Sequence, residues 1–232
     1  MTADTIKTAD NRLKQGGNAM VYVLIALALF GFLTITLSRS NNQASGQDID
    51  DEQAKLYASE LMEYAASAQI IIEQMLDSGS EITELDFIIP SDAGFNTPPH
   101  FHKIYHPQGG GLNHQATFNE AIHNGVGSVW AVNNQINVEW TKLDTDGITE
   151  LNDVILTAYF VSRQICEIIN EKITGDTTIH ATTSLHADHF LPTGTTDFTT
   201  TECVNCNGRP ALCVREGTSN NYSFYSIIAT RQ

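Results

Sequence analysis

The longest apolar stretch of the chain lies near its N-terminus, where the 20 residues from Asn18 to Leu37 carry no charged side chain. About 20 helical residues cross the hydrocarbon core of a bilayer, and a helix satisfies its own backbone hydrogen bonds there. The pattern therefore predicts a transmembrane helix over 18–37, preceded by a leader over 1–17. A cleaved signal peptide is the alternative, although the apolar region of such peptides is usually shorter.

Basic residues on the two sides of the predicted span indicate its orientation. Lys7, Arg12 and Lys14 precede the span, whereas Arg39 is the nearest basic residue after it. Cytoplasmic flanks carry the excess of Lys and Arg, so the leader is predicted to stay in the cytoplasm. The residues after the span then lie on the other side of the membrane.

A polar segment over 38–47 separates the span from the remainder of the chain, 48–232, which we expect to form one exported domain. Its first element is predicted to be a helix that begins near Asp48 and ends near Asp77, before Gly79. Apolar residues recur at three- and four-residue steps on one face of this helix, as expected for packing on a sheet or between subunits. These residues are Tyr57, Leu61, Tyr64, Ala65, Ala68, Ile72, Met75 and Leu76.

Shorter elements follow, and their order predicts an α+β fold with a small antiparallel sheet. A strand over 86–89 is expected to end at Pro90, and the Pro- and Gly-rich residues 91–124 are expected to form a poorly ordered surface loop. Alternating residues over 127–140 predict a hairpin that turns at Asn133-Asn134. The remaining predictions are a helix over 149–173 before Gly175, a Thr-rich loop or edge strand over 178–201, and a last strand over 222–229.

The acidic charge of the chain excludes some partners. The formal net charge is −15, and the part after the predicted span contains 25 acidic and 9 basic residues. Such a surface repels phosphate backbones, so nucleic-acid binding by the exported domain is not expected. The ordinary interpretation of this acidic surface is that it keeps the domain soluble. Cation binding is the alternative interpretation.

Four cysteines lie in the last third of the chain, at Cys166, Cys203, Cys206 and Cys213. Outside the cytoplasm an even number of cysteines predicts disulfides, and four cysteines allow three pairings. One hypothesis joins Cys166 to the 203–213 loop, which would staple that loop to the domain. Others close Cys203 or Cys206 to Cys213, and a zinc site at the Cys203-x-x-Cys206 pair is a further alternative.

Two groups of residues are candidate metal ligands, both weaker than their structural alternatives. Asp144, Asp146 and Glu150 resemble part of a calcium loop, but the spacing fits a turn followed by a helix cap better. His102 and His106 are the second candidates. All the histidines of the two His-rich segments, 100–114 and 180–189, are expected to be solvated in loops. We therefore expect no firm metal or cofactor, with Ca²⁺ as the minor possibility.

Motifs for nucleophilic catalysis are missing from the sequence. The segment Gly125-Val-Gly127-Ser128 lacks the final glycine of a nucleophile elbow and enters a predicted strand. It also lacks the lysine of a phosphate-binding loop. We therefore expect a protein that is not an enzyme.

The order of leader, glycine, apolar helix and amphipathic helix resembles that of type IV pilins and type II secretion pseudopilins. The leader ends in Gly16-Gly17 directly before the span. A pilin-like group of alphaproteobacterial proteins offers the nearest resemblance, in the opening Gly-Asn-Ala and apolar run, the Trp130 segment, the Cys166 helix and the end Tyr222-Ser-Phe-Tyr225. The chain departs from classical pilins at Tyr22, where a mature fifth-position Glu is usual.

The resemblance implies cleavage between Gly17 and Asn18 by a prepilin peptidase. It also implies a subunit held in a bacterial inner membrane by one span, with its C-terminal domain in the periplasm or outside the cell. Its partners would be the lipid bilayer and other pilin-like subunits or further copies of itself. The alternative is an anchored ligand- or metal-binding domain that is not part of a filament.

Overall fold

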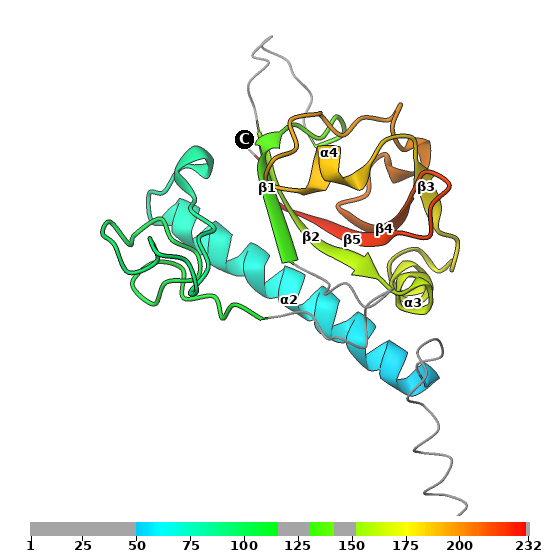
Figure 1. Cartoon of the computed structure of the whole chain (residues 1–232), viewed down its shortest axis with the longest axis horizontal. Helices are drawn as coiled ribbons and strands as arrows, with labels where there is room; N and C mark the ends of the chain where they lie inside the picture. The colour runs from blue at the N-terminus through cyan, green and yellow to red at the C-terminus, as the bar shows by residue number, and fades with distance from the viewer. Residues whose placement is uncertain (1–49, 116–129, 142–151, 231–232) are drawn as a thin grey trace, which may run out of the picture. The chain divides into compact units, whose positions relative to one another are not determined.

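The computed structural model describes residues 50–115, 130–141 and 152–230 (Figure 1). The predicted leader, transmembrane span and linker lie outside these ranges and stay predictions. Among the described residues, no helix has both the length and the apolar character needed to cross a bilayer.

The predicted long amphipathic helix is confirmed as α2, Asp51–Asp77. Asp51 and Glu52 occupy its first turn, where carboxylates interact favourably with the positive end of the helix dipole. The helix ends at Asp77 with Ser78 as its C-cap, and Gly79 follows with φ 101°, a left-handed conformation that glycine adopts without steric cost. Its buried residues are Ala54, Ala58, Leu61, Tyr64, Ala65, Ala68, Ile72 and Met75.

Five strands form one sheet in the order β1-β2-β5-β4-β3. Neighbouring strands are antiparallel except β3 and β4, which are parallel, so the sheet is mixed rather than wholly antiparallel as predicted. The last strand of the chain therefore lies in the middle of the sheet. The strands are β1 Trp130–Ile136, β2 Asp153–Val161, β3 His180–Thr182, β4 Ala211–Glu216 and β5 Tyr222–Ala229.

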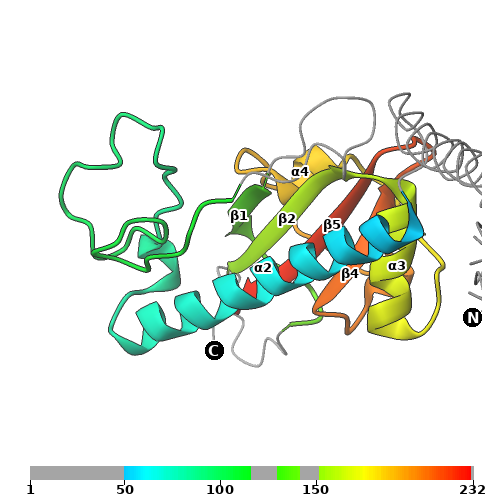
Figure 2. The same ribbon diagram turned by 90° about the horizontal axis from the view of Figure 1, so that it is seen from below.

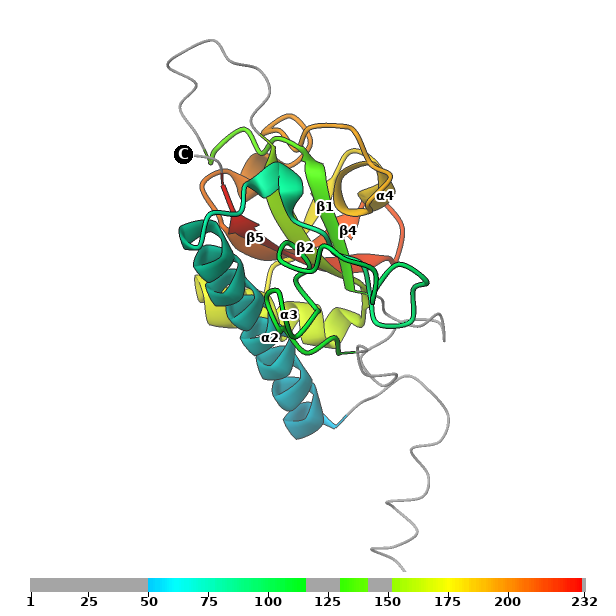
Figure 3. The ribbon, with the colours of Figure 1, turned by 90° about the vertical axis from the view of Figure 1, so that its left-hand side faces the viewer.

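Helices cover both faces of the sheet (Figures 2 and 3). On one face α2 contacts β5, and α3, Arg163–Thr174, contacts α2, β4 and β5. On the other face α4, His186–Phe190, contacts β1 and β2. Because both faces are covered, every residue of β5 is buried. Short 3-10 helices at Ile82–Glu84 and Val204–Cys206 complete the described elements.

The predicted hairpin at Asn133-Asn134 is wrong, because Trp130–Ile136 is one continuous strand. Asn133 lies inside this strand with no exposed surface. Its side-chain amide donates to the carbonyl oxygens of His189 at 2.8 Å and Gly194 at 3.0 Å, and its Oδ1 accepts from the backbone N–H of Gln135. Asn133, which the sequence suggests as a turn residue, thus donates hydrogen bonds to backbone carbonyl groups of α4 and of the loop that follows it.

The predicted helix over 149–173 is wrong over Asp153–Val161, which is β2, whereas residues 149–151 lie outside the described ranges. The helix begins only at Arg163, where the Ser162 hydroxyl accepts from the Ile165 backbone N–H, and it ends before Gly175 as predicted. A continuous apolar run fits a strand buried on both faces as well as a helix, so spacing alone does not separate them.

Two further predictions are corrected in part. The segment 86–89 is not a strand, because only Asp86 forms a bridge, with Lys103. The Thr-rich segment contains the predicted edge strand as β3 but also α4. Strand β4, which follows the cysteine-rich loop, was not predicted.

Candidate functional site

The outward face of α2 is the first candidate for contact with another molecule. Leu56 and Ile70 lie on this face, each with 55% of its surface exposed. Glu63 lies between them on the same face and is exposed. The two apolar residues are therefore separated by a charged residue and do not form a continuous apolar patch.

The loop from Leu85 to Leu112 projects beside the C-terminal half of α2 and is well organised, contrary to prediction (Figure 1). The backbone N–H of Asp86 donates to His102 O, and that of Ile104 donates to Asp86 O. The N–H of Leu112 in turn donates to Ile104 O at 3.0 Å. The two arms of the loop are thus hydrogen-bonded to each other, which fixes its shape without a regular strand.

Lys103 is the centre of this loop, with only 6% of its surface exposed. Its ammonium donates to the carbonyl oxygens of Gly94 at 2.7 Å, Phe95 at 3.0 Å and Thr97 at 2.5 Å. An ammonium has three protons, so these three bonds use its full donor capacity. The hydrogen bonds of a buried lysine, rather than those of a helix or sheet, therefore hold residues 94–103 in place.

The candidate metal ligands His102 and His106 are each engaged by other protein groups. The Nδ1 of His102 lies 3.1 Å from Ser80 Oγ and 3.6 Å from a Glu84 carboxylate oxygen. The ring of His106 stacks on His100 with centroids 3.9 Å apart, and its Nδ1 accepts from the Gln108 N–H. Within 50–115, 130–141 and 152–230, no three His, Cys, Asp or Glu side chains converge as metal ligands.

The cysteines form two disulfides, Cys166–Cys213 and Cys203–Cys206. The first joins α3 to β4, which confirms that Cys166 staples the 203–213 loop to the domain. The alternatives that close Cys203 or Cys206 to Cys213 are wrong. With all four cysteines bonded, no thiolate is left for the alternative zinc site.

Other predicted site residues lie outside the described ranges. These are the calcium candidates Asp144, Asp146 and Glu150 and the processing residues Gly17 and Asn18. All five stay predictions.

A buried polar cluster between α4 and the sheet was missed, because its histidines were expected to be solvated. His186 and His189 have no exposed surface. The Nδ1 of His186 lies 2.8 Å from Ser223 Oγ on β5, and its backbone N–H donates to Glu216 Oε1 at the end of β4. The Nδ1 of His189 donates to Thr196 O at 2.9 Å. The signal available in the sequence was their position one turn apart beside Phe190, which is fully buried.

The charges of this cluster follow from its burial. Burial lowers the pKa of His186 to about 4, and the nearby Glu216 carboxylate only partly offsets this. Burial by itself would raise the pKa of Glu216, but hydrogen bonds from Asn221 and the His186 N–H outweigh it and lower that pKa. The buried cluster therefore stabilises a neutral His186 imidazole beside an ionised Glu216 carboxylate.

We expect stability to depend on pH through His186. An unfolded histidine takes up its proton near pH 6.5, whereas folded His186 does so near pH 4. The unfolded state thus binds more protons between these values, so this contribution is complete above about pH 6.5 and is lost towards pH 4. For this group alone, the free energy of unfolding falls by about 2 kcal/mol between pH 7.5 and pH 5. Urea unfolding at both pH values measures the difference.

The variant His186→Gln isolates this effect, because glutamine does not titrate. Its stability should vary less with pH than that of the parent chain. Equal pH dependence in His186→Gln and the parent chain would contradict the assignment.

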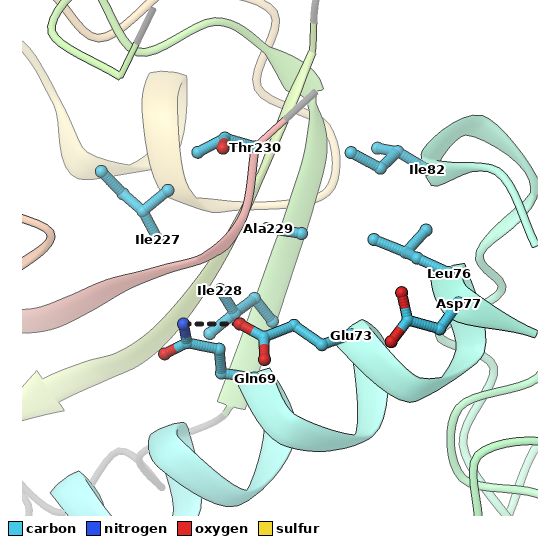
Figure 4. A pocket seen from close by; sticks show the side chains of 9 residues that line it. All are labelled: Gln69, Glu73, Leu76, Asp77, Ile82, Ile227, Ile228, Ala229 and Thr230. Carbon is cyan, nitrogen blue, oxygen red and sulfur yellow. Dashed lines mark hydrogen bonds between the residues drawn. The ribbon is translucent and has the colours of Figure 1, made fainter. Parts of the chain in front are cut away.

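A cavity of about 430 Å³ lies between the C-terminal half of α2 and the end of β5 (Figure 4). It combines an apolar wall with polar side chains from one side of α2. The lining residues are Gln69, Glu73, Leu76, Asp77, Ile82, Ile227, Ile228, Ala229 and Thr230.

Comparison with protein-family models, with curated proteins and with solved structures gave no match to this chain.

Proposed function

We propose that the chain is a membrane-anchored, pilin- or pseudopilin-like structural subunit with an exported α+β head. The observation that carries this proposal is the placement of α2. This helix begins 14 residues after the predicted span ends at Leu37, and its buried face lies across the sheet. A span followed by a helix on a sheet is the arrangement expected of a head carried on one membrane stalk.

The disulfides support export of the head. Cys166 and Cys213 are both fully buried and join two elements of the head. Disulfides persist in oxidising compartments and are rare in the cytoplasm of mesophiles. Their presence agrees with the basic flank that predicts a cytoplasmic leader.

Mass analysis of the mature N-terminus tests this function. We expect cleavage between Gly17 and Asn18, so that the native chain lacks its first 17 residues. The variant Gly17→Leu should keep Met1, because a bulky side chain replaces the residue before the cut. Gly16→Ala is the matched control and should still be cleaved. A native chain that retains Met1 would overturn the pilin-like proposal.

An anchored binding domain is the second candidate, favoured by the ordered loop from Leu85 to Leu112. This loop exposes Phe101, with 47% of its surface accessible, on a scaffold held by Lys103. Rigid loops that present aromatic side chains are typical of binding surfaces. Shearing of whole cells distinguishes the two functions, since filament subunits are released as polymers whereas an anchored receptor stays with the membrane.

A further inference from the structure

The apolar wall of the cavity between α2 and β5 comes from both elements. Ile82, Ile228 and Ala229 form the closely packed floor of the cavity, with 7%, 1% and 8% of their surface exposed, and half-buried Leu76 presents most of the apolar surface. The volume of about 430 Å³ lies within the range of small ligand sites. The cavity therefore offers apolar contact to a narrow group such as an aliphatic chain.

The charged part of the cavity comes from Glu73 and Asp77, one helical turn apart on α2. Figure 4 shows both side chains on the cavity side of the helix, with Glu73 accepting a hydrogen bond from Gln69 at 3.0 Å. None of the described residues that line the cavity is Lys, Arg or His. In the described part of the chain, neither carboxylate has a basic partner within 4 Å.

This placement of the two carboxylates costs stability. Like charges four residues apart on a helix repel each other. Both also lie near the C-terminal end of α2, where the helix dipole is negative and where the last turn holds no basic residue. A cation at the mouth of the cavity would relieve both repulsions.

We propose that this cavity binds a lysine or arginine side chain of another polypeptide. The aliphatic stem lies along Leu76, above the floor that Ile82 and Ile228 form, and the charged end meets Glu73 and Asp77. Lysine and arginine bury their methylene stems while their charged ends stay near water, which matches an apolar wall below an acidic rim. The inference rests on the proposed function only for the identity of the partner, which would be a neighbouring subunit.

Binding of two tripeptides to the full chain in detergent micelles tests the site. The probes are acetyl-Leu-Lys-Leu-amide and acetyl-Leu-Gln-Leu-amide, and the readout is the methyl NMR signals of Leu76 and Ile228. We expect the lysine peptide to bind about fivefold more tightly, because it gains two partly exposed charge pairs. The double variant Glu73→Gln/Asp77→Asn should bind both peptides equally.

Glu63→Gln is the matched control, since Glu63 is an exposed carboxylate of the same helix away from the cavity. It should keep the preference for lysine. Equal affinity of the two peptides for the parent chain would overturn the proposal. A preference for the lysine peptide that is seen only in the variant Arg231→Gln would also overturn the proposal. In that case Arg231 of the same chain, rather than another polypeptide, would occupy the cavity.

Failure of the site and failure of the proposed function give different results. A native chain that retains Met1 overturns the pilin-like role without changing the peptide titration. Equal peptide affinities overturn the cavity inference without changing the N-terminal mass.

Discussion

Replacing Lys103 with methionine is expected to lower the free energy of unfolding by about 3 kcal/mol. Methionine has a similar length but no ammonium, so the carbonyl oxygens of Gly94, Phe95 and Thr97 lose their shared donor. The bond to Phe95 O is buried and the other two are partly buried, so water replaces the lost donor only in part and the loop opens to gain bonds to water. Urea unfolding measures the global effect, and hydrogen exchange over residues 85–112 measures the opening of the loop.

Lys55→Met is the matched control, because Lys55 is an exposed lysine on α2. It should change stability by less than about 0.5 kcal/mol, as is usual for surface substitutions. Lys103→Arg is the second comparison. It keeps the charge, but a planar guanidinium does not fit three carbonyls arranged around one nitrogen, so it should recover only part of the loss. Wild-type exchange rates over 85–112 in Lys103→Met would contradict the role of Lys103.

The elements that follow from the sequence are those whose local pattern agrees with their tertiary setting. Helix α2 has an apolar stripe, acidic residues in its first turn and Gly79 after its end, and all three agree with a surface helix. The final strand is rich in β-branched and aromatic residues, as strands are. Its position in the middle of the sheet did not follow, because strand order depends on long-range contacts.

The elements that were missed are those in which a tertiary contact overrides a local signal. Asn133 has the chemistry of a turn residue, but here it bonds to the backbone of the α4 loop, 56 and 61 residues away in the chain. The Pro- and Gly-rich loop has the composition of a disordered segment, yet Lys103 orders it. Asn133 reaches carbonyl groups far along the chain, and Lys103 reaches carbonyl groups six to nine residues before it, so neither set of bonds follows from three- and four-residue spacing.

The residues of the candidate site also divide into those that the sequence predicts and those that it does not. All four cysteines are predicted to form disulfides from their number and setting, and a bridge from Cys166 to the 203–213 loop is one of the predicted alternatives, without a choice of partner in that loop. His186 was expected to be solvated because its segment is rich in threonine, whereas β5 and α4 bury it completely. The cavity was not predicted at all, since it is formed by two segments about 150 residues apart.

The Cys166–Cys213 disulfide should contribute about twice as much stability as Cys203–Cys206. The first closes a segment of 47 residues and the second a segment of 3 residues. In the chain-entropy account, a cross-link stabilises by restricting the unfolded chain, and the effect grows with the logarithm of the closed length. The expected contributions are about 4 kcal/mol for the long segment and about 2 kcal/mol for the short one.

The double variants Cys166→Ala/Cys213→Ala and Cys203→Ala/Cys206→Ala measure these contributions by urea unfolding, and each serves as the control for the other. All four cysteines are buried, so the loss of buried sulfur is similar in the two variants. Asn170 keeps α3 bound to β4 in the first variant, through its bonds to the Cys213 N–H and carbonyl, so the fold should persist there. An equal loss of unfolding free energy in the two variants would contradict the chain-entropy account. It would show that local packing, rather than closure of the chain, determines how much each disulfide stabilises the fold.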